Sequence, residues 1–210
     1  MPATHPDHFA TFSLPRHLHL DTQALEKSFY AQSRKLHPDR FPPDQQEAAL
    51  AASSSLNDAY RALRDPILRT QHLLTLEGVA LEEQSKAATD AARTSGTQKK
   101  QLIPPELLEE VFELNMQLMD MKSANEMGDE AGSADVDPDL RRDLQSAANT
   151  FNQKMSETQQ ELEALWLRWD QAQTTADEPQ KTAVKEALVT LLNKRSYLRN
   201  LVRDVQSALE

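Results

Sequence analysis

The chain has 210 residues, of which 39% are hydrophobic and 27% are charged, with 4 glycines, no cysteine and a net charge of −10. The absence of cysteine excludes disulfides, thiolate metal sites and cysteine nucleophiles. Residues 104–210 hold 11 Lys and Arg against 21 Asp and Glu, which argues against nucleic acid and anionic membranes and favours a basic protein partner.

Helix-forming residues dominate the composition and strand-type alternation is absent, so we predict an all-α fold. No apolar run approaches the roughly 20 residues of a membrane span. The six histidines form no HExxH-like pair, and neither a GxxxxGK loop nor a GxGxxG turn is present, so we expect no metal site and no bound nucleotide. The start of the chain resembles neither a secretory signal nor an import presequence. We therefore expect a bacterial cytoplasmic location, with the mitochondrial matrix as the alternative.

The first 80 residues predict a helical hairpin. After short helical pieces near the N-terminus, Asp21 or Thr22 can cap a helix that continues through Leu36. Because Pro38 has no amide proton and restricts the residue before it, this helix ends at His37.

A second, alanine-rich helix follows the proline-rich corner and is predicted to run antiparallel to the first. Asp44 stands where it can cap this helix. The next helix has Asp65 as its cap and Pro66 at its first position, and Gly78 closes its end.

Residues 81–103 contain few large apolar side chains, and we predict that they link two domains, residues 1–80 and residues 104–210. Three long amphipathic segments make up the second domain. The first follows Pro104-Pro105, the second opens at Asp137-Pro138, and the third opens between Asp177 and Pro179. Joined by short turns, they predict a three-helix bundle.

The first of these helices carries two apolar stripes. At about 100° per residue, one stripe suffices as a bundle seam and the other lies roughly 120° around the axis. The seam contains Leu107, Val111, Leu114, Leu118 and Met121. The second stripe contains Leu108, Phe112, Met116 and Met119, with Glu109, Glu113 and Asp120 just beyond it. Either a third helix covers the second stripe, or the stripe is an exposed protein-binding surface with an acidic rim.

The tripeptide His-Pro-Asp occurs twice, at residues 5–7 and 37–39, and we interpret the first copy as a coincidence. The second copy follows an amphipathic helix in a basic corner, where three prolines would hold the His37 ring and the Asp39 carboxylate in the open. Desolvation of such groups against complementary charge would orient another protein and speed its association. In other interpretations, Asp39 caps the loop or pairs with Arg40, or His37 and Asp39 form a catalytic dyad, for which no nucleophile motif is present.

The second copy lies in a series that resembles the J-domain of DnaK-type chaperone partners: a helix, the His-Pro-Asp loop, a second helix, and NDAYRALRDP at residues 57–66. The chain also resembles the HscB-type co-chaperones of iron–sulfur cluster assembly over nearly its whole length. Similar landmarks are HFATFSLPRHLHLD at residues 8–21, ILRTQHLL at residues 67–74 and the acidic LLEEVFEL at residues 107–114. The resemblance implies an N-terminal J-domain followed by a C-terminal three-helix bundle.

The resemblance also implies that the corner triggers ATP hydrolysis in a DnaK/HscA-type chaperone. The chain itself would be no enzyme and would need no cofactor. The implied chaperone-binding residues are His37, Pro38, Asp39, Arg34, Lys35, Lys27 and Arg40. The helix before the loop is less basic than is usual in J-domains, since Glu26, Ser28 and Ala31 dilute its basic face, and we expect a modest affinity for the chaperone.

In HscB-type proteins the C-terminal bundle is understood to bind an IscU-type scaffold protein. The positions that match this surface are Leu108, Phe112, Glu113, Met116 and Tyr197. They coincide largely with the second apolar stripe, which favours the exposed interpretation of that stripe. We therefore expect an adaptor that delivers the scaffold to the chaperone. The alternatives are a different client protein, or self-association of the chain through the stripe.

Overall fold

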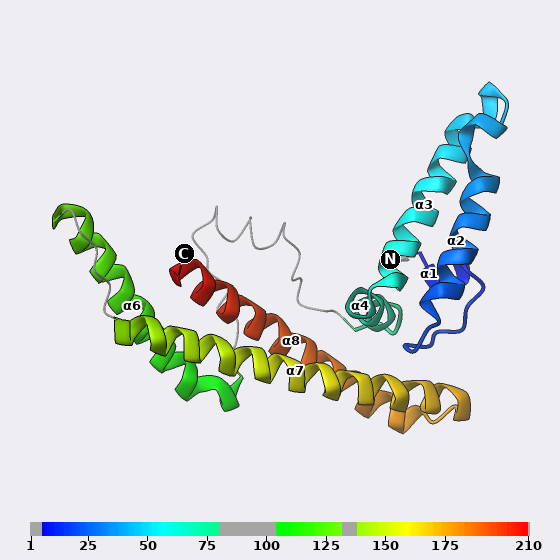
Figure 1. Cartoon of the computed structure of the whole chain (residues 1–210). Helices are drawn as coiled ribbons and strands as arrows, with labels where there is room; N and C mark the ends of the chain where they lie inside the picture. Colours follow the sequence, from blue (N-terminus) through cyan, green and yellow to red (C-terminus); the bar gives the residue numbers. More distant parts are fainter. Residues whose placement is uncertain (1–5, 80–103, 132–137, 210) are drawn as a thin grey trace. The chain divides into compact units, whose positions relative to one another are not determined.

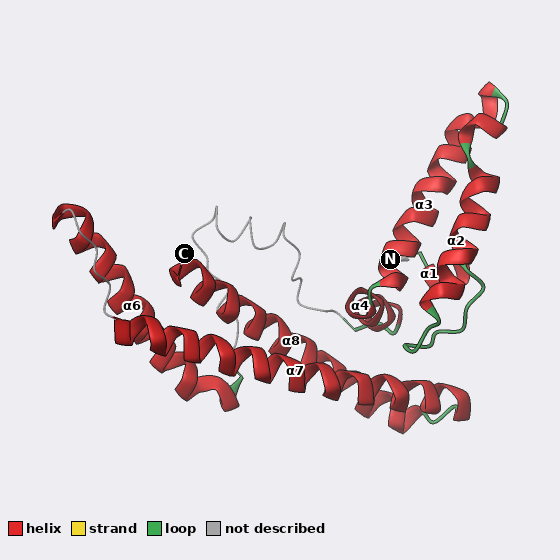
Figure 2. Cartoon of the chain, in the orientation of Figure 1, coloured by secondary structure: helices red, strands yellow, loops and turns green. Residues whose placement is uncertain are grey.

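The computed structural model describes residues 6–79, 104–131 and 138–209, with side chains left out at residues 124–131. All regular secondary structure in these ranges is helical, which confirms the predicted all-α class (Figure 2). None of the described helices is long and apolar enough to cross a membrane. The predicted linker, residues 81–103, lies outside the described residues.

The chain divides into two compact units. The described residues of the first unit are 6–79 and 164–189, and those of the second are 104–131, 138–163 and 190–209. Two long helices, α7 (Pro138–Thr175) and α8 (Glu178–Leu209), therefore contribute residues to both units. The domain boundaries proposed from the sequence stay a prediction, and the first unit also takes in a part of the predicted second domain.

The first unit is built on a helical hairpin, in which α2 packs against α3 (Figure 1). The elements of its N-terminal part are α1 (His8–Thr11), α2 (Thr22–Leu36), the 3-10 turns η1 (Pro38–Arg40) and η2 (Pro43–Gln45), α3 (Gln46–Arg64) and α4 (Pro66–Leu76). Asp21 caps α2 by accepting hydrogen bonds from two backbone amides at 2.9 and 3.0 Å. Because Pro38 excludes helical backbone at His37, α2 ends at Leu36, as predicted.

The ends of α4 also follow the sequence signals. Asp65 accepts hydrogen bonds from the amides of Ile67 and Leu68, and Pro66 is the first helical residue. Gly78 adopts a φ of +78°, the left-handed conformation that ends helices and favours glycine.

The predicted cap of α3 is wrong. Asp44 lies inside the η2 turn, and the residue that precedes α3 is Gln45, which makes no side-chain capping bond. Two consecutive prolines, Pro42 and Pro43, start this tight turn, and the turn leads directly into the helix. Asp44 therefore lies within the 3-10 turn and does not occupy the position that precedes α3.

The core of the first unit combines the hairpin with the segment 164–189. Its largest fully buried side chains are Phe9, Leu18, Leu56, Leu63, Leu73, Leu74 and Trp169. Arg69 is also buried and donates a hydrogen bond to the carbonyl of Leu63 at 2.6 Å. Burial lowers the pKa of Arg69, an effect opposed by the negative charges of Asp170 and Asp65.

The second unit contains η3 (Pro105–Leu107), α6 (Leu108–Ala131) and the adjoining parts of α7 and α8. All three helices contribute to one core, in agreement with the predicted three-helix bundle. The buried residues of this core are Leu107, Val111, Leu114, Met121, Leu144, Ala148, Phe151, Leu198, Leu201 and Val205. Two ion pairs also tie this part of the chain to its neighbours: Glu110 of α6 with Lys154 of α7 at 2.7 Å, and Glu106 of η3 with Lys194 of α8 at 3.7 Å.

Candidate functional site

The corner between α2 and α3 is a short, hydrogen-bonded turn. The amide of Arg40 donates to the carbonyl of His37, and the amide of Phe41 donates to the carbonyl of Pro38, both at 3.0 Å. The η1 turn between them also packs against α3. The proline and these two bonds leave the corner little conformational freedom.

The His37 and Asp39 side chains of this corner are open to solvent, with 59% and 88% of their areas exposed. The His37 Nδ1 atom accepts a hydrogen bond from the Asp39 amide at 3.3 Å and lies 3.6 Å from the Asp39 carboxylate. The imidazole is therefore held by the backbone of its own turn. Both side chains are exposed, as the sequence predicted.

Arg34, Lys35 and Arg40 lie beside the corner in the sequence, whereas Lys27 lies ten residues before His37 on α2. Lys27, Arg34, Lys35 and Arg40 are all exposed. The Arg40 guanidinium donates to the carbonyl of Arg34 at 3.1 Å, which supplies a partner for one of the free carbonyls at the end of α2. The implied chaperone-binding residues on α2 and η1 thus lie on one continuous stretch of the hairpin.

Sequence reasoning missed an exposed aromatic residue on this face. Tyr30 of α2 is 55% exposed, and its carbonyl accepts a hydrogen bond from the Arg34 side chain at 3.3 Å. Tyr30 stands three residues after Lys27 and four before Arg34, which places all three on one side of the helix. That spacing was the available signal. Aromatic residues with basic neighbours are frequent at protein interfaces.

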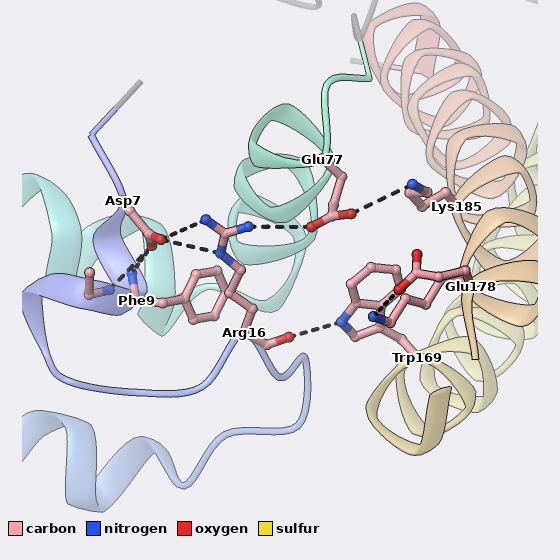
Figure 3. A network of polar contacts seen from close by, with 9 residues as sticks. Asp7, Phe9, Arg16, Glu77, Trp169, Glu178 and Lys185 are labelled. Carbon is pink, nitrogen blue, oxygen red and sulfur yellow. Dashed lines mark hydrogen bonds and ion pairs between the residues drawn. The ribbon is translucent and has the colours of Figure 1, made fainter. Parts of the chain in front are cut away.

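Asp7, the last residue of the first His-Pro-Asp copy, stabilises the local structure. The Asp7 carboxylate caps α1 by accepting hydrogen bonds from two amides and pairs with Arg16 at 2.9 Å. Partial burial raises the pKa of Asp7, but hydrogen bonds from Arg16 and from the α1 backbone outweigh burial and lower this pKa below its ordinary value. The guanidinium of Arg16 also forms an ion pair with Glu77, and Glu77 forms a second ion pair with Lys185 (Figure 3).

A second group of contacts fixes the segment that leads into α2. The indole Nε1 of Trp169 donates to the carbonyl of Arg16 at 2.9 Å, as Figure 3 shows. The Asp170 carboxylate accepts hydrogen bonds from the amides of Leu18 and His19 at 2.7 and 2.9 Å. Two consecutive residues of α7 therefore hold three backbone groups of this segment. No sequence motif pointed to these contacts.

The second stripe of α6 is exposed. Leu108, Phe112, Met116 and Met119, here called the α6 strip, are each between 53% and 71% exposed. Of the two interpretations left open by the sequence, the structure supports the uncovered stripe. Glu109, Glu113 and Asp120 are exposed beside the strip, as the predicted acidic rim requires.

Tyr197 of α8 differs from the other predicted scaffold-binding residues because it is partly buried against the core of the second unit. This burial raises the pKa of the Tyr197 hydroxyl, and the negative charge of Asp204 raises it further. Only part of this side chain is therefore available to a partner.

An open groove of about 250 Å³ lies between α6 and α7, and its lining includes Glu113 of α6 and Asp143 of α7. Glu110 also lines the groove, and its hydrogen bond from Lys154 lowers the pKa of its carboxyl. The groove extends the acidic character of the α6 surface toward α7. Among the described side chains, no group of three or more His, Cys, Asp or Glu is placed to hold a metal ion.

Comparison with known proteins agrees with the family resemblance. No family model matches the chain. Over 89 residues it is 42% identical to the Co-chaperone protein HscB homolog of Bordetella petrii, a match that covers 41% of this chain and 52% of that protein. The resemblance to HscB-type co-chaperones is confirmed. The match spans about half the length of this curated relative.

Two solved structures share the fold. Chaperone HscB from Vibrio cholerae is 20% identical, with a TM-score of 0.55 and coverage of 96% of both chains. The human co-chaperone protein HscB is 18% identical, with a TM-score of 0.56, and the match covers 98% of this chain and 83% of that one. At these identities the two matches establish the fold.

Proposed function

We propose that this chain is an HscB-type co-chaperone of iron–sulfur cluster assembly. It binds an IscU-type scaffold protein through its C-terminal helices and presents it to a DnaK/HscA-type chaperone. The corner at residues 37–39 then stimulates the ATPase of that chaperone. The observation that carries this proposal is the rigid corner itself, on which His37 and Asp39 are exposed beside a basic helix face.

The chaperone contact rests on charge and rigidity. Lys27, Arg34, Lys35 and Arg40 complement an acidic surface, and such complementarity mainly raises the association rate and orients the partner. Because the turn is already formed, little conformational entropy is lost when it binds. The ATP is hydrolysed by the chaperone, and this chain is not an enzyme.

The scaffold contact rests on the α6 strip. Four exposed apolar side chains with an acidic rim suit a partner surface that is apolar at its centre and basic at its edge. Glu113 is the rim residue that the family resemblance also selects, and Tyr197 adds a partly buried contact on α8. Because one chain carries both contacts, the scaffold is concentrated near the chaperone and neither contact has to be tight.

The test is the chaperone ATPase rate, measured with this protein alone and with the scaffold added. We expect His37→Gln to abolish the stimulation and to retain scaffold binding. We expect Leu108→Ala combined with Phe112→Ala to weaken scaffold binding and to retain stimulation by the protein alone. If either change abolished both activities in a folded protein, the proposed division of work would be wrong.

Matched controls are present in the chain. His19 is an exposed histidine outside the corner, and His19→Gln should leave the ATPase stimulation unchanged. Leu167 of α7 is 53% exposed, as Leu108 is, so Leu167→Ala controls for the loss of one exposed leucine.

Self-association through the α6 strip is the competing use of the same surface, and the exposure of four apolar side chains favours it as well. Sedimentation velocity of the untreated protein and of the Leu108→Ala/Phe112→Ala variant separates the two. A dimer that dissociates in the variant, together with no scaffold binding, would replace the adaptor by a homodimerising protein.

A further inference from the structure

The α6 strip carries two exposed thioethers. Met116 and Met119 are 54% and 71% exposed. Of the other methionines whose side chains are described, Met121 is only 2% exposed and Met155 is partly buried against the core. Among the methionines with described side chains, the two that are solvent-exposed therefore both lie on the candidate scaffold-binding surface.

Exposed methionine is readily oxidised. Its sulfur attacks one oxygen of a peroxide, the O–O bond breaks, a sulfur–oxygen bond forms, and hydrogen peroxide is reduced to water. The sulfur loses two electrons and becomes a sulfoxide. A methionine sulfoxide reductase with two thiols reverses the step, forming water and a disulfide of the reductant. Because this chain has no cysteine, no thiol of its own competes for the oxidant.

We propose that Met116 and Met119 form a reversible oxidation site that turns off partner binding at the α6 strip. This inference rests on the proposed function, because it assigns a regulation to the same surface. The oxidant is a peroxide, and the reductant is a thiol acting through a methionine sulfoxide reductase.

The surroundings of the two sulfurs make the change costly for binding. Oxidation replaces a flexible apolar side chain by one with a strongly polar oxygen. The rim residues beside the strip, Glu113 and Asp120, are carboxylates that accept hydrogen bonds and have none to donate when ionised. These two carboxylates therefore cannot donate a hydrogen bond to the new sulfoxide oxygen, and its desolvation opposes binding. We expect each sulfoxide to weaken partner binding by about tenfold.

The first measurement is the site of oxidation in the folded, full-length protein. After brief treatment with dilute hydrogen peroxide, fragment-ion mass spectrometry of the peptide that carries these methionines gives the oxidised fraction at each one. We expect Met119 and Met116 to react well before Met121, which lies two residues away on the buried face of the same helix. Equal reaction of Met121 would overturn the inference.

The second measurement is scaffold affinity before and after the same treatment. We expect the treated protein to bind about tenfold more weakly or worse, and methionine sulfoxide reductase with a thiol to restore the affinity. In the Met116→Leu/Met119→Leu variant, compared only with itself, peroxide should change the affinity by less than about twofold. Met155→Leu is the control for leucine replacement elsewhere in the unit, and it should remain as sensitive to peroxide as the unchanged protein.

The outcomes distinguish this inference from the proposed function. If untreated protein failed to bind the scaffold, the proposed function would be overturned, and this inference with it. If untreated protein bound and the protein oxidised at Met116 and Met119 bound equally well, only the oxidation switch would be overturned. Loss of binding in the double leucine variant after peroxide would also overturn it, because the sensitive group would then lie elsewhere.

Discussion

Removing the charge of Asp170 should destabilise the first unit. Its carboxylate accepts the amide hydrogens of Leu18 and His19 at 2.7 and 2.9 Å, and Leu18 is fully buried. An Asp170→Asn side chain keeps one acceptor oxygen and presents a donor to the second amide. One hydrogen bond to a charged acceptor is therefore lost, which costs about 1.5–3 kcal/mol.

A further cost comes from Arg69. Burial lowers the pKa of this guanidinium, and Asp170 is the largest contributor that opposes the effect. Without the carboxylate charge, the buried cation loses part of its compensation. Together with the lost hydrogen bond we expect a destabilisation of about 2–4 kcal/mol, or a fall in Tm of about 5–15 °C for a chain of this size.

The assay is urea unfolding followed by tryptophan fluorescence. Both tryptophans of the chain, Trp166 and Trp169, belong to the first unit, so the signal reports on the unit that Asp170 stabilises. Asp44→Asn is the control, because Asp44 lies in the same unit and its side chain is exposed. That variant should stay within about 0.5 kcal/mol of the unchanged protein. Equal midpoints for the two variants would refute the reasoning.

Three further outcomes are expected. Leu107→Ala, at the end of η3, should lower the free energy of unfolding by about 2–5 kcal/mol because Leu107 is fully buried. Leu108→Ala, at the first residue of α6, should stay within about 0.5 kcal/mol because Leu108 is exposed, and thermal melts of the two variants check this difference. Burial lowers the pKa of His8 below the ordinary 6.5, so the fold favours the neutral ring and loses stability as the pH falls below that value. Urea midpoints at about pH 7.5 and about pH 5.5 should show a loss that shrinks in His8→Gln. Gly78→Ala should cost about 1 kcal/mol in urea unfolding, because φ is +78° and nothing lies within 4 Å of an added Cβ, and Gly78→Asn should recover part of it.

Local signals in the sequence were sufficient for most helix ends. The caps at Asp21 and Asp65, the proline at position 66 and the glycine at position 78 depend on neighbours within a few residues, so their effects could be predicted directly. Asp44 shows the limit of this approach. A cap signal after two prolines was ambiguous, because the prolines can equally start a 3-10 turn that carries the aspartate into the helical path.

Contacts between distant segments could not be predicted. Trp169 and Asp170 bind backbone groups about 150 residues earlier, and an amphipathic pattern shows which face of α7 is buried but not what covers it. The covering of α6 was open for the same reason. Its two stripes follow from helical geometry, whereas the choice between a covered and an exposed stripe depends on where α7 and α8 lie against it.

The candidate surfaces share a design that explains why substitutions can separate function from folding. On α2, the buried Leu25 packs inward while the basic residues and Tyr30 face solvent. On α6, the strip is exposed while the seam residues Val111, Leu114 and Met121 are buried. The buried face of each helix thus stabilises the fold, and its exposed face can contact a partner protein. Because exposed side chains contribute little to the free energy of unfolding, the residues on either outer face are constrained mainly by the partner they meet. Tyr30 and the α6 strip are accordingly where partner specificity can change without loss of the fold.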